Sequence, residues 1–147
     1  MSNNSKTPIN TPPKIPKISP KQIAHAYIYG SYSEFTDEFI CGGFIIFNNK
    51  KHILQYRIRD CDFKEIKSEA GELLAAMKVI EKAVELKIRK LNLFYECLGV
   101  EMWANGEGKR DNNCIEKYYN FMQSVRDIIL INFIRIEHSS DEMRVEI

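Results

Sequence analysis

Four lysines near the start of the chain are spaced so that they could bind a row of phosphate groups through charge. They lie among the five prolines of the sequence, all within the first 20 residues, and no acidic residue precedes Glu34. Proline removes a backbone donor and disfavours helix at the preceding residue, so we expect residues 1–22 to form an extended, disordered arm. A flexible cationic segment can follow a phosphate backbone. The pattern therefore predicts contacts to nucleic acid from Lys6, Lys14, Lys17 and Lys21.

The cysteines do not have the spacing of a metal site. Zinc ligands come in close pairs, and small disulfide-stabilised domains carry a higher density of cysteine than this chain does. We expect reduced, mostly buried thiols at the four widely separated positions, Cys41, Cys61, Cys97 and Cys114.

The composition indicates one folded domain. The chain has 147 residues, of which 44% are hydrophobic, enough to bury a sizeable core. No apolar run approaches the roughly 20 residues that cross a bilayer, and no signal peptide opens the chain, so we expect a soluble, cytoplasmic protein without a membrane partner. With the four arm lysines set aside, 17 basic residues face 20 acidic ones, a formal charge of −3. This balance argues against general nucleic-acid affinity outside the arm.

Apolar periodicity predicts the elements that would position a site. Strand-like patterns occur at residues 23–29, 39–48, 51–59, 91–96 and 128–137. Helical spacing occurs at residues 68–87, 100–104 and 114–126. A strand–helix–strand succession after an antiparallel meander implies parallel pairing through a right-handed crossover. The predicted fold class is therefore α/β, with a mixed five-stranded sheet and flanking helices.

Local signals mark two of the boundaries. Asn48 and Asn49 are typical of a tight hairpin turn between two strands. Ser68 is placed to cap the long helix, with Glu69 and Glu72 in the positive first turn.

Four segments, in order along the chain, resemble a known family. They are AYIYGSY at residues 26–32, SEAGELLAAM at 68–77, FYECLGVEMWANGE at 94–107 and FIRIEHSSD at 133–141. Together they resemble type 1 ribonuclease H, in the branch often fused to a viroplasmin-like module. The resemblance covers residues 23–147 and implies one ribonuclease H-like domain after the arm. It also implies an enzyme that cuts the RNA strand of an RNA/DNA hybrid with two Mg²⁺ ions about 4 Å apart, held by four acids.

The resemblance assigns three of those acids to positions in this sequence. The first, an aspartate that bridges the metals, falls on Tyr29, whose phenol is neutral at pH 7 and cannot bridge two cations. The second is kept as Glu72. The third falls on Glu96, which keeps the charge but places its carboxylate about 1.5 Å further out than aspartate would. The family pattern thus implies a degraded catalytic site, with Glu72 and Glu96 as weak metal ligands if they bind metal at all.

The remaining family positions lie near the two ends of the match. The sequence ends at Ile147, about where the fourth acid would appear, so we expect the C-terminal helix that carries it to be missing. His138 matches the family histidine that assists product release. Without a metal site beside it, that role would have no function here. Ser31, in the segment that resembles the family's Asp-Gly-Ser, is a further candidate contact to nucleic acid.

Structural roles compete with each catalytic one. Glu72 could simply favour the helix dipole, Glu96 could be a solvated acid, and Tyr29 could fill the space of lost metals or offer a platform for stacking a base. Three acids from loops could also serve as replacement ligands, namely Glu34, Asp37 and Asp141.

Two functions remain open from the sequence. The first is a domain that has lost catalysis and acts as a nucleic-acid-binding or assembly component, with a hybrid, RNA, a ribonucleoprotein or a protein as partner and no cofactor. The second is a metal-dependent endonuclease for RNA/DNA hybrids that uses Mg²⁺ through an altered ligand set. Because the last helix normally covers one sheet face, its loss predicts exposed apolar residues there, and hence self-association or a protein partner.

Overall fold

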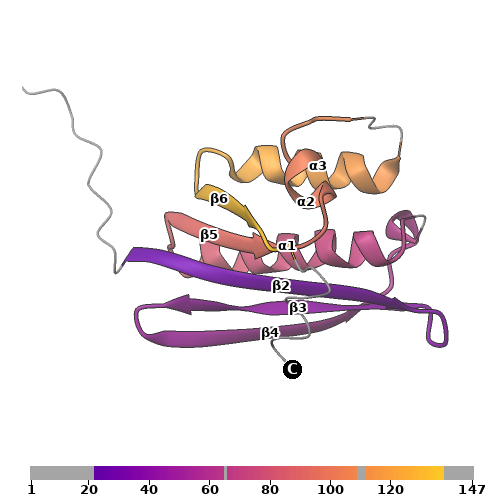
Figure 1. Cartoon of the computed structure of the whole chain (residues 1–147), viewed down its shortest axis with the longest axis horizontal. Helices are drawn as coiled ribbons and strands as arrows, with labels where there is room; N and C mark the ends of the chain where they lie inside the picture. The colour runs from indigo at the N-terminus through magenta and orange to yellow at the C-terminus, as the bar shows by residue number, and fades with distance from the viewer. Residues whose placement is uncertain (1–21, 65, 109–111, 138–147) are drawn as a thin grey trace, which may run out of the picture.

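The computed structural model describes residues 22–64, 66–108 and 112–137. Its elements follow the predicted order (Figure 1): β2 (Ile23–Ser33), β3 (Glu38–Phe47), β4 (Lys50–Ile58), the short 3-10 turn η2 (Cys61–Phe63), α1 (Ser68–Glu85), β5 (Lys90–Tyr95), α2 (Gly99–Met102), α3 (Asn113–Val125) and β6 (Leu130–Arg135). None of the described helices is long and apolar enough to span a membrane.

The five strands form one mixed sheet in the order β4-β3-β2-β5-β6. The pairs β2–β3 and β3–β4 are antiparallel, and the pairs β2–β5 and β5–β6 are parallel. This arrangement confirms the predicted fold class. Asn48 and Asn49 both have positive φ, 54° and 63°, as the predicted tight turn between β3 and β4 requires.

The first strand is longer than predicted. We expected it to end at Tyr29 and turn, but β2 continues to Ser33. Its last residues, from Gly30 onward, pair with residues 38–41 of β3. Pairing across the sheet therefore extends the strand beyond its apolar run.

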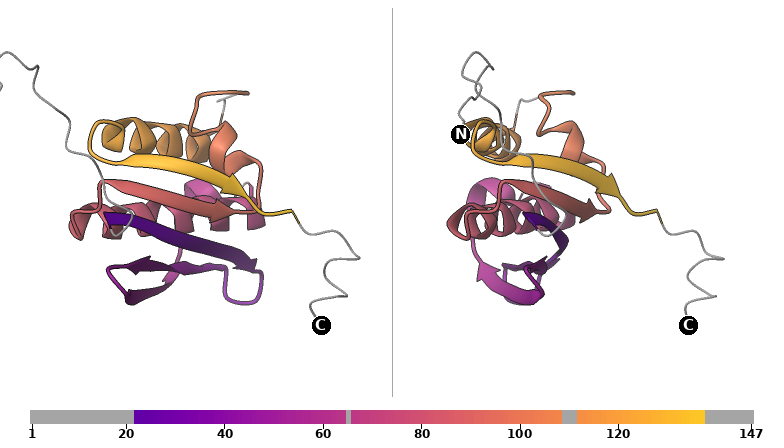
Figure 2. Two further views of the ribbon diagram at one scale, coloured as in Figure 1. Left: turned by 60° about the vertical axis from the view of Figure 1, so that its left-hand side comes forward. Right: turned by 90° about the vertical axis from the view of Figure 1, so that its left-hand side faces the viewer.

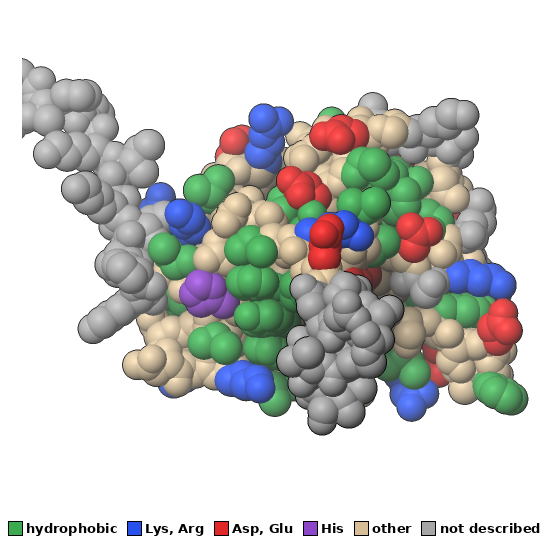
Figure 3. Space-filling model, in the orientation of Figure 1, with side chains coloured by type: hydrophobic (Ala, Val, Ile, Leu, Met, Phe, Trp, Pro, Cys, Tyr) green, Lys and Arg blue, Asp and Glu red, His purple; other side chains and the backbone are tan. Residues whose placement is uncertain are grey.

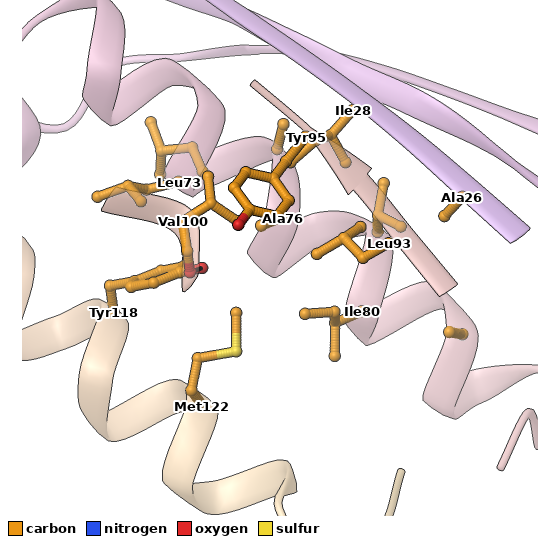
Figure 4. Packing of buried hydrophobic residues seen from close by; sticks show 14 of the residues in the cluster. Ala26, Ile28, Leu73, Ala76, Ile80, Leu93, Tyr95, Val100, Tyr118 and Met122 are labelled. Carbon is orange, nitrogen blue, oxygen red and sulfur yellow. Dashed lines mark hydrogen bonds between the residues drawn. The ribbon is translucent and has the colours of Figure 1, made fainter. Parts of the chain in front are cut away.

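Helices α1 and α3 lie on the same side of the sheet, and none of the described helices covers the other side (Figure 2). Ala26 and Ile28 of β2 are buried and alternate with residues that are more exposed, so they face α1. Figure 4 shows the resulting core, to which β2, β5 and the three helices contribute. The residues that pack with Ala26 and Ile28 in this core include Leu73, Ala76, Ile80, Leu93, Tyr95, Val100, Tyr118 and Met122. The helical spacing that predicted α1 and α3 is confirmed by this burial.

The ends of α1 differ from the prediction. Ser68 is the first helical residue rather than the cap, because Lys67 occupies the cap position with φ of 53° and makes no side-chain capping bond. Glu69 is the acid of the first turn, and Glu72 lies beyond it. The helix ends at Glu85, since Lys87 has a left-handed φ of 65°. The expected placement of Glu72 in the first turn is therefore wrong.

Several predictions concern residues outside those that the structure describes. The basic arm and its lysines lie in residues 1–21, and His138, Asp141 and the expected absence of a C-terminal helix lie in residues 138–147. The boundary between an arm and a domain near residue 22 stays a prediction.

Candidate active site

Two glycines bring the candidate residues together. Gly30 of β2 and Gly71 of α1 meet backbone to backbone, and a Cβ on Gly30 would lie 2.1 Å from the carbonyl carbon of Gly71. No real Cβ tolerates that distance, so both positions need glycine for the helix to cross the strand this closely. The neighbours of these glycines are Tyr29 and Glu72, which the crossing places at the same end of the sheet.

The carboxylate of Glu72 binds the backbone at the end of β5. Its Oε1 accepts hydrogen bonds from the N–H groups of Glu96, at 2.7 Å, and Cys97, at 2.9 Å. The residue is only 9% exposed. Burial raises the pKa of Glu72 above its ordinary value, although the two N–H bonds oppose this shift. One oxygen of this carboxylate is thus committed to holding the chain that follows β5 against α1.

Glu96 lies beside Glu72 with an exposed side chain. Its negative charge contributes to the raised pKa of Glu72, which places the two carboxylates within electrostatic reach of each other. Its backbone carbonyl accepts a hydrogen bond from Nε of Arg135, at 3.0 Å. The predicted pair of acids, Glu72 and Glu96, is therefore brought together by the fold.

Arg135 is a member of the site that sequence reasoning missed. Its guanidinium forms an ion pair with Glu137 at 3.1 Å, in addition to the bond to the Glu96 carbonyl, and its charge lowers the pKa of Glu72. A fixed cation thus stands beside the acids. An arginine that ends an apolar strand was the signal in the sequence, but only the parallel pairing of β6 with β5 shows what it faces.

Tyr29 points to the other side of the sheet. It lies between Ile28, which is buried toward α1, and Gly30, whose missing side chain would face Gly71. Alternation along the strand therefore directs Tyr29 to the face away from α1, where it is 46% exposed. Ser31 is exposed on the same face. Opposite Tyr29, β3 carries Gly42, so the position of β3 paired directly with Tyr29 has no side chain.

The described residues offer a smaller set of metal ligands than the family resemblance implies. Within residues 22–64, 66–108 and 112–137, no three His, Cys, Asp or Glu side chains converge as a metal site. Glu72 and Glu96 are a pair, and Oε1 of Glu72 already accepts two hydrogen bonds. Two Mg²⁺ ions need several oxygen ligands in near-octahedral geometry, so these two acids do not fit a two-metal centre.

Two of the three loop acids named as replacement ligands are engaged elsewhere, and the third, Asp141, lies outside the described residues. Asp37 accepts hydrogen bonds from the Tyr32 hydroxyl and from Lys64, and these bonds lower the pKa of Asp37. Glu34 pairs with Lys67 at 3.3 Å. Neither contact involves Glu72 or Glu96.

A cavity of about 290 Å³ lies between α3 and β6. Its lining mixes apolar side chains such as Met122 and Phe133 with the polar side chains of Asn105, Gln123 and Arg126. None of the candidate site residues contributes to it, so it has no link to the chemistry considered above.

The comparison with solved structures agrees with the observed fold. No protein-family model matches the sequence, and no curated protein matches it. Among solved structures, ribonuclease H1 of the halophilic archaeon Halobacterium salinarum superposes with a TM-score of 0.63 at 13% identity, over 82% of this chain and 89% of that one. The N-terminal ribonuclease H domain of a Mycobacterium tuberculosis protein superposes with a TM-score of 0.61 at 12% identity, over 82% and 91%. At these identities the comparison concerns architecture, and this chain has a ribonuclease H-like fold.

Proposed function

We propose that this chain is a ribonuclease H-like domain that has lost catalysis and acts as a nucleic-acid-binding or assembly component. The observation that carries the proposal is the carboxylate of Glu72, whose Oε1 accepts two backbone N–H groups of the segment after β5. This acid, the best preserved of the family positions, therefore has a structural task that explains its presence.

Electrostatics supports the loss of a two-metal mechanism. Two Mg²⁺ ions about 4 Å apart repel strongly, and anionic ligands between them are needed to hold the pair. Tyr29 offers a phenol in place of a carboxylate and is directed away from α1, and Arg135 adds a positive charge beside the two glutamates. The pair Glu72 and Glu96 would hold at most one ion, weakly, so the proposed function needs no cofactor.

The assembly role is supported by the sheet face away from α1, which we call the outer face. It carries an aromatic row of Phe44, Tyr27 and Phe94 from three neighbouring strands. The ring of Tyr27 is stacked on Phe44 with centroids 4.9 Å apart and on Phe94 with centroids 4.5 Å apart. Figure 3 looks onto this face and shows hydrophobic side chains in a band across the middle strands.

The stacking favours one kind of partner for this row over another. Both faces of the Tyr27 ring are covered by its neighbours, so the row presents ring edges rather than ring faces to the outside. A nucleic-acid base stacks on an exposed ring face. The aromatic row therefore suits an apolar protein surface, including a second copy of this chain, better than it suits bases.

The decisive experiment is a cleavage assay with the purified chain and a labelled RNA/DNA hybrid in millimolar Mg²⁺ or Mn²⁺. We expect no detectable cleavage by the native chain. A Glu72→Gln variant serves as the matched control, and an active ribonuclease H serves as the positive control. Metal-dependent cutting that Glu72→Gln abolishes would overturn the proposal. It would establish instead the alternative, a metal-dependent endonuclease for RNA/DNA hybrids with an altered ligand set.

A further inference from the structure

Basic side chains gather at one end of the sheet. This end is formed by the start of β2, the turn between β3 and β4, the turn between α1 and β5 and the turn between α3 and β6, at the left in Figure 1. It carries six cations, which we call the basic end: Lys50, Lys51, Lys87, Arg89, Lys90 and Arg126. All are exposed except Lys90, which is half-buried. Acidic side chains near this end are Glu85, which pairs with Lys82, and Asp127.

The cations of the basic end differ from those at the opposite end in their partners. Within the described chain, none of the six lies within 4.0 Å of a carboxylate oxygen. Lys51 sits over the Phe44 ring, and Arg126 donates to the neutral Gln123 side chain. At the opposite end, each described lysine and arginine has an acidic partner: Arg57, Arg59, Lys64, Lys67, Lys117 and Arg135. The positive charge is therefore neutralised at one end and uncompensated at the other.

The basic end is continuous across the sheet. The turn before β5 and the start of β6 are joined by a hydrogen bond from the N–H of Leu130 to the carbonyl of Arg89. From β4 to β6 the sheet has four strand spacings, which span about 19 Å. Each strand of a B-form duplex advances about 3.4 Å per phosphate along the helix axis, so this width matches on the order of five phosphates of one strand.

The chain order connects the basic end to the N-terminal lysines. Strand β2 begins at Ile23 at this end of the sheet, one residue after Gln22. Lys21 is next to Gln22 in the sequence, and Lys17 and Lys14 precede it. The described chain therefore begins at the basic end, and the four lysines of residues 1–21 come directly before it in the sequence.

We propose that the basic end binds the phosphate backbone of RNA or of an RNA/DNA hybrid, on the side of the domain opposite to Glu72 and Glu96. This inference rests on the proposed function and locates its nucleic-acid contact on the folded domain. The opposite end carries Glu69, Glu72, Glu96 and Glu101, which repel a polyanion. The backbone is therefore bound where uncompensated cations lie and away from the family's catalytic position.

The test compares two variants of the full chain that lose the same charge. One carries Lys50→Gln, Lys87→Gln and Arg89→Gln, three exposed cations of the basic end. The control carries Lys64→Gln, Lys67→Gln and Lys117→Gln, three cations that are paired at the opposite end. Binding of fluorescein-labelled single-stranded RNA and of an RNA/DNA hybrid is measured by polarisation over a range of NaCl concentrations, and circular dichroism verifies that both variants are folded.

The expected result is a change in salt dependence confined to one variant. The four lysines before Gln22 alone allow a slope of log K against log[salt] no steeper than roughly −4, so we expect a steeper slope for the native chain. In the basic-end variant the slope should become shallower by about three, and binding near 0.1 M salt should be at least about tenfold weaker. The control should bind within about twofold of the native chain.

Other outcomes overturn the inference in distinguishable ways. If the native chain binds nucleic acid and the basic-end variant binds equally well, or if both variants weaken alike, this surface is not the contact and the proposed function stands. If the native chain binds neither probe, the nucleic-acid role in the proposed function falls together with the surface. Charge-dependent binding to phosphatidylserine vesicles without binding to either nucleic acid would assign the basic end to an anionic lipid surface instead.

Discussion

Oε1 of Glu72 lies 2.7 Å from the backbone nitrogen of Glu96, and this contact joins the helix α1 to the chain at the end of β5. The same oxygen accepts the N–H of Cys97 at 2.9 Å. A carboxylate that satisfies two backbone donors contributes to the fold whether or not it binds metal. Substitutions of Glu72 can therefore test its structural role separately from a catalytic role.

Replacing Glu72 should affect stability according to what the new side chain can accept. In Glu72→Gln the amide oxygen can still accept both N–H groups, so we expect a change in the free energy of unfolding within about 1 kcal/mol. In Glu72→Ala both donors lose their partner, and we expect a loss of about 1–3 kcal/mol or more. Urea unfolding followed by circular dichroism measures both, and an equal loss in the two variants would contradict the role assigned to these hydrogen bonds.

The raised pKa of Glu72 predicts a pH dependence of stability. The folded chain holds the proton of Glu72 more tightly than the unfolded chain does, so the contribution of this residue to stability falls as pH rises from the ordinary value of 4.5 through the raised value, and is constant above it. The urea midpoint of the native chain should therefore decline relative to that of Glu72→Gln over this interval. A difference between the two that stays constant, or that grows in favour of the native chain, would contradict the prediction.

The crossing of β2 and α1 predicts a large effect of a small substitution. In Gly30→Ala the new methyl group would lie 2.1 Å from a backbone carbon of Gly71, and neither backbone can move without disturbing the core. We expect a loss of about 1–3 kcal/mol or more in unfolding free energy. Ser31→Ala, at the next and exposed position, serves as the control and should change stability by no more than about 0.5 kcal/mol.

The outer face predicts self-association or association with a protein partner. Ile53, which pairs with Phe44 across β3 and β4, is 73% exposed and extends the aromatic row. Light scattering of the purified chain at micromolar concentration should give a mass above that of the monomer. Ile53→Lys should lower that mass without lowering the melting temperature. A stable monomer over the whole concentration range would remove self-association.

Restoring the first family acid should not restore cleavage. Tyr29→Asp places a carboxylate on the outer face, whereas Oε1 of Glu72 remains bound to backbone N–H groups and Glu96 keeps its longer side chain. Misplacement of a catalytic group by about 1 Å can cost ~10²-fold in rate. We expect no hybrid cleavage above background in the same assay. Metal-dependent cutting by Tyr29→Asp alone would show that a single substitution separates this site from an active one.

The sequence by itself determined the class and order of the elements. Burial of one face makes apolar residues recur every two positions in strands and every 3.6 positions in helices. The spacing of the apolar residues therefore predicted β2 to β6, α1 and α3 without knowledge of the fold. The turn at Asn48 and Asn49 could be predicted for the same local reason, since few residues accept its positive φ. The resemblance also identified Glu72 and Glu96 as neighbours, and the fold brings them together.

Only the tertiary structure decided what those residues contact. The bond from Glu96 N–H to Glu72 spans 24 positions, and the bond from Arg135 to the Glu96 carbonyl spans 39, so no local pattern could indicate either. The length of β2 depended on its pairing with β3, and the basic end arises from turns that are distant along the chain. Periodicity reports which side of an element is buried, whereas hydrogen-bond partners and charge neighbours depend on how separate elements pack.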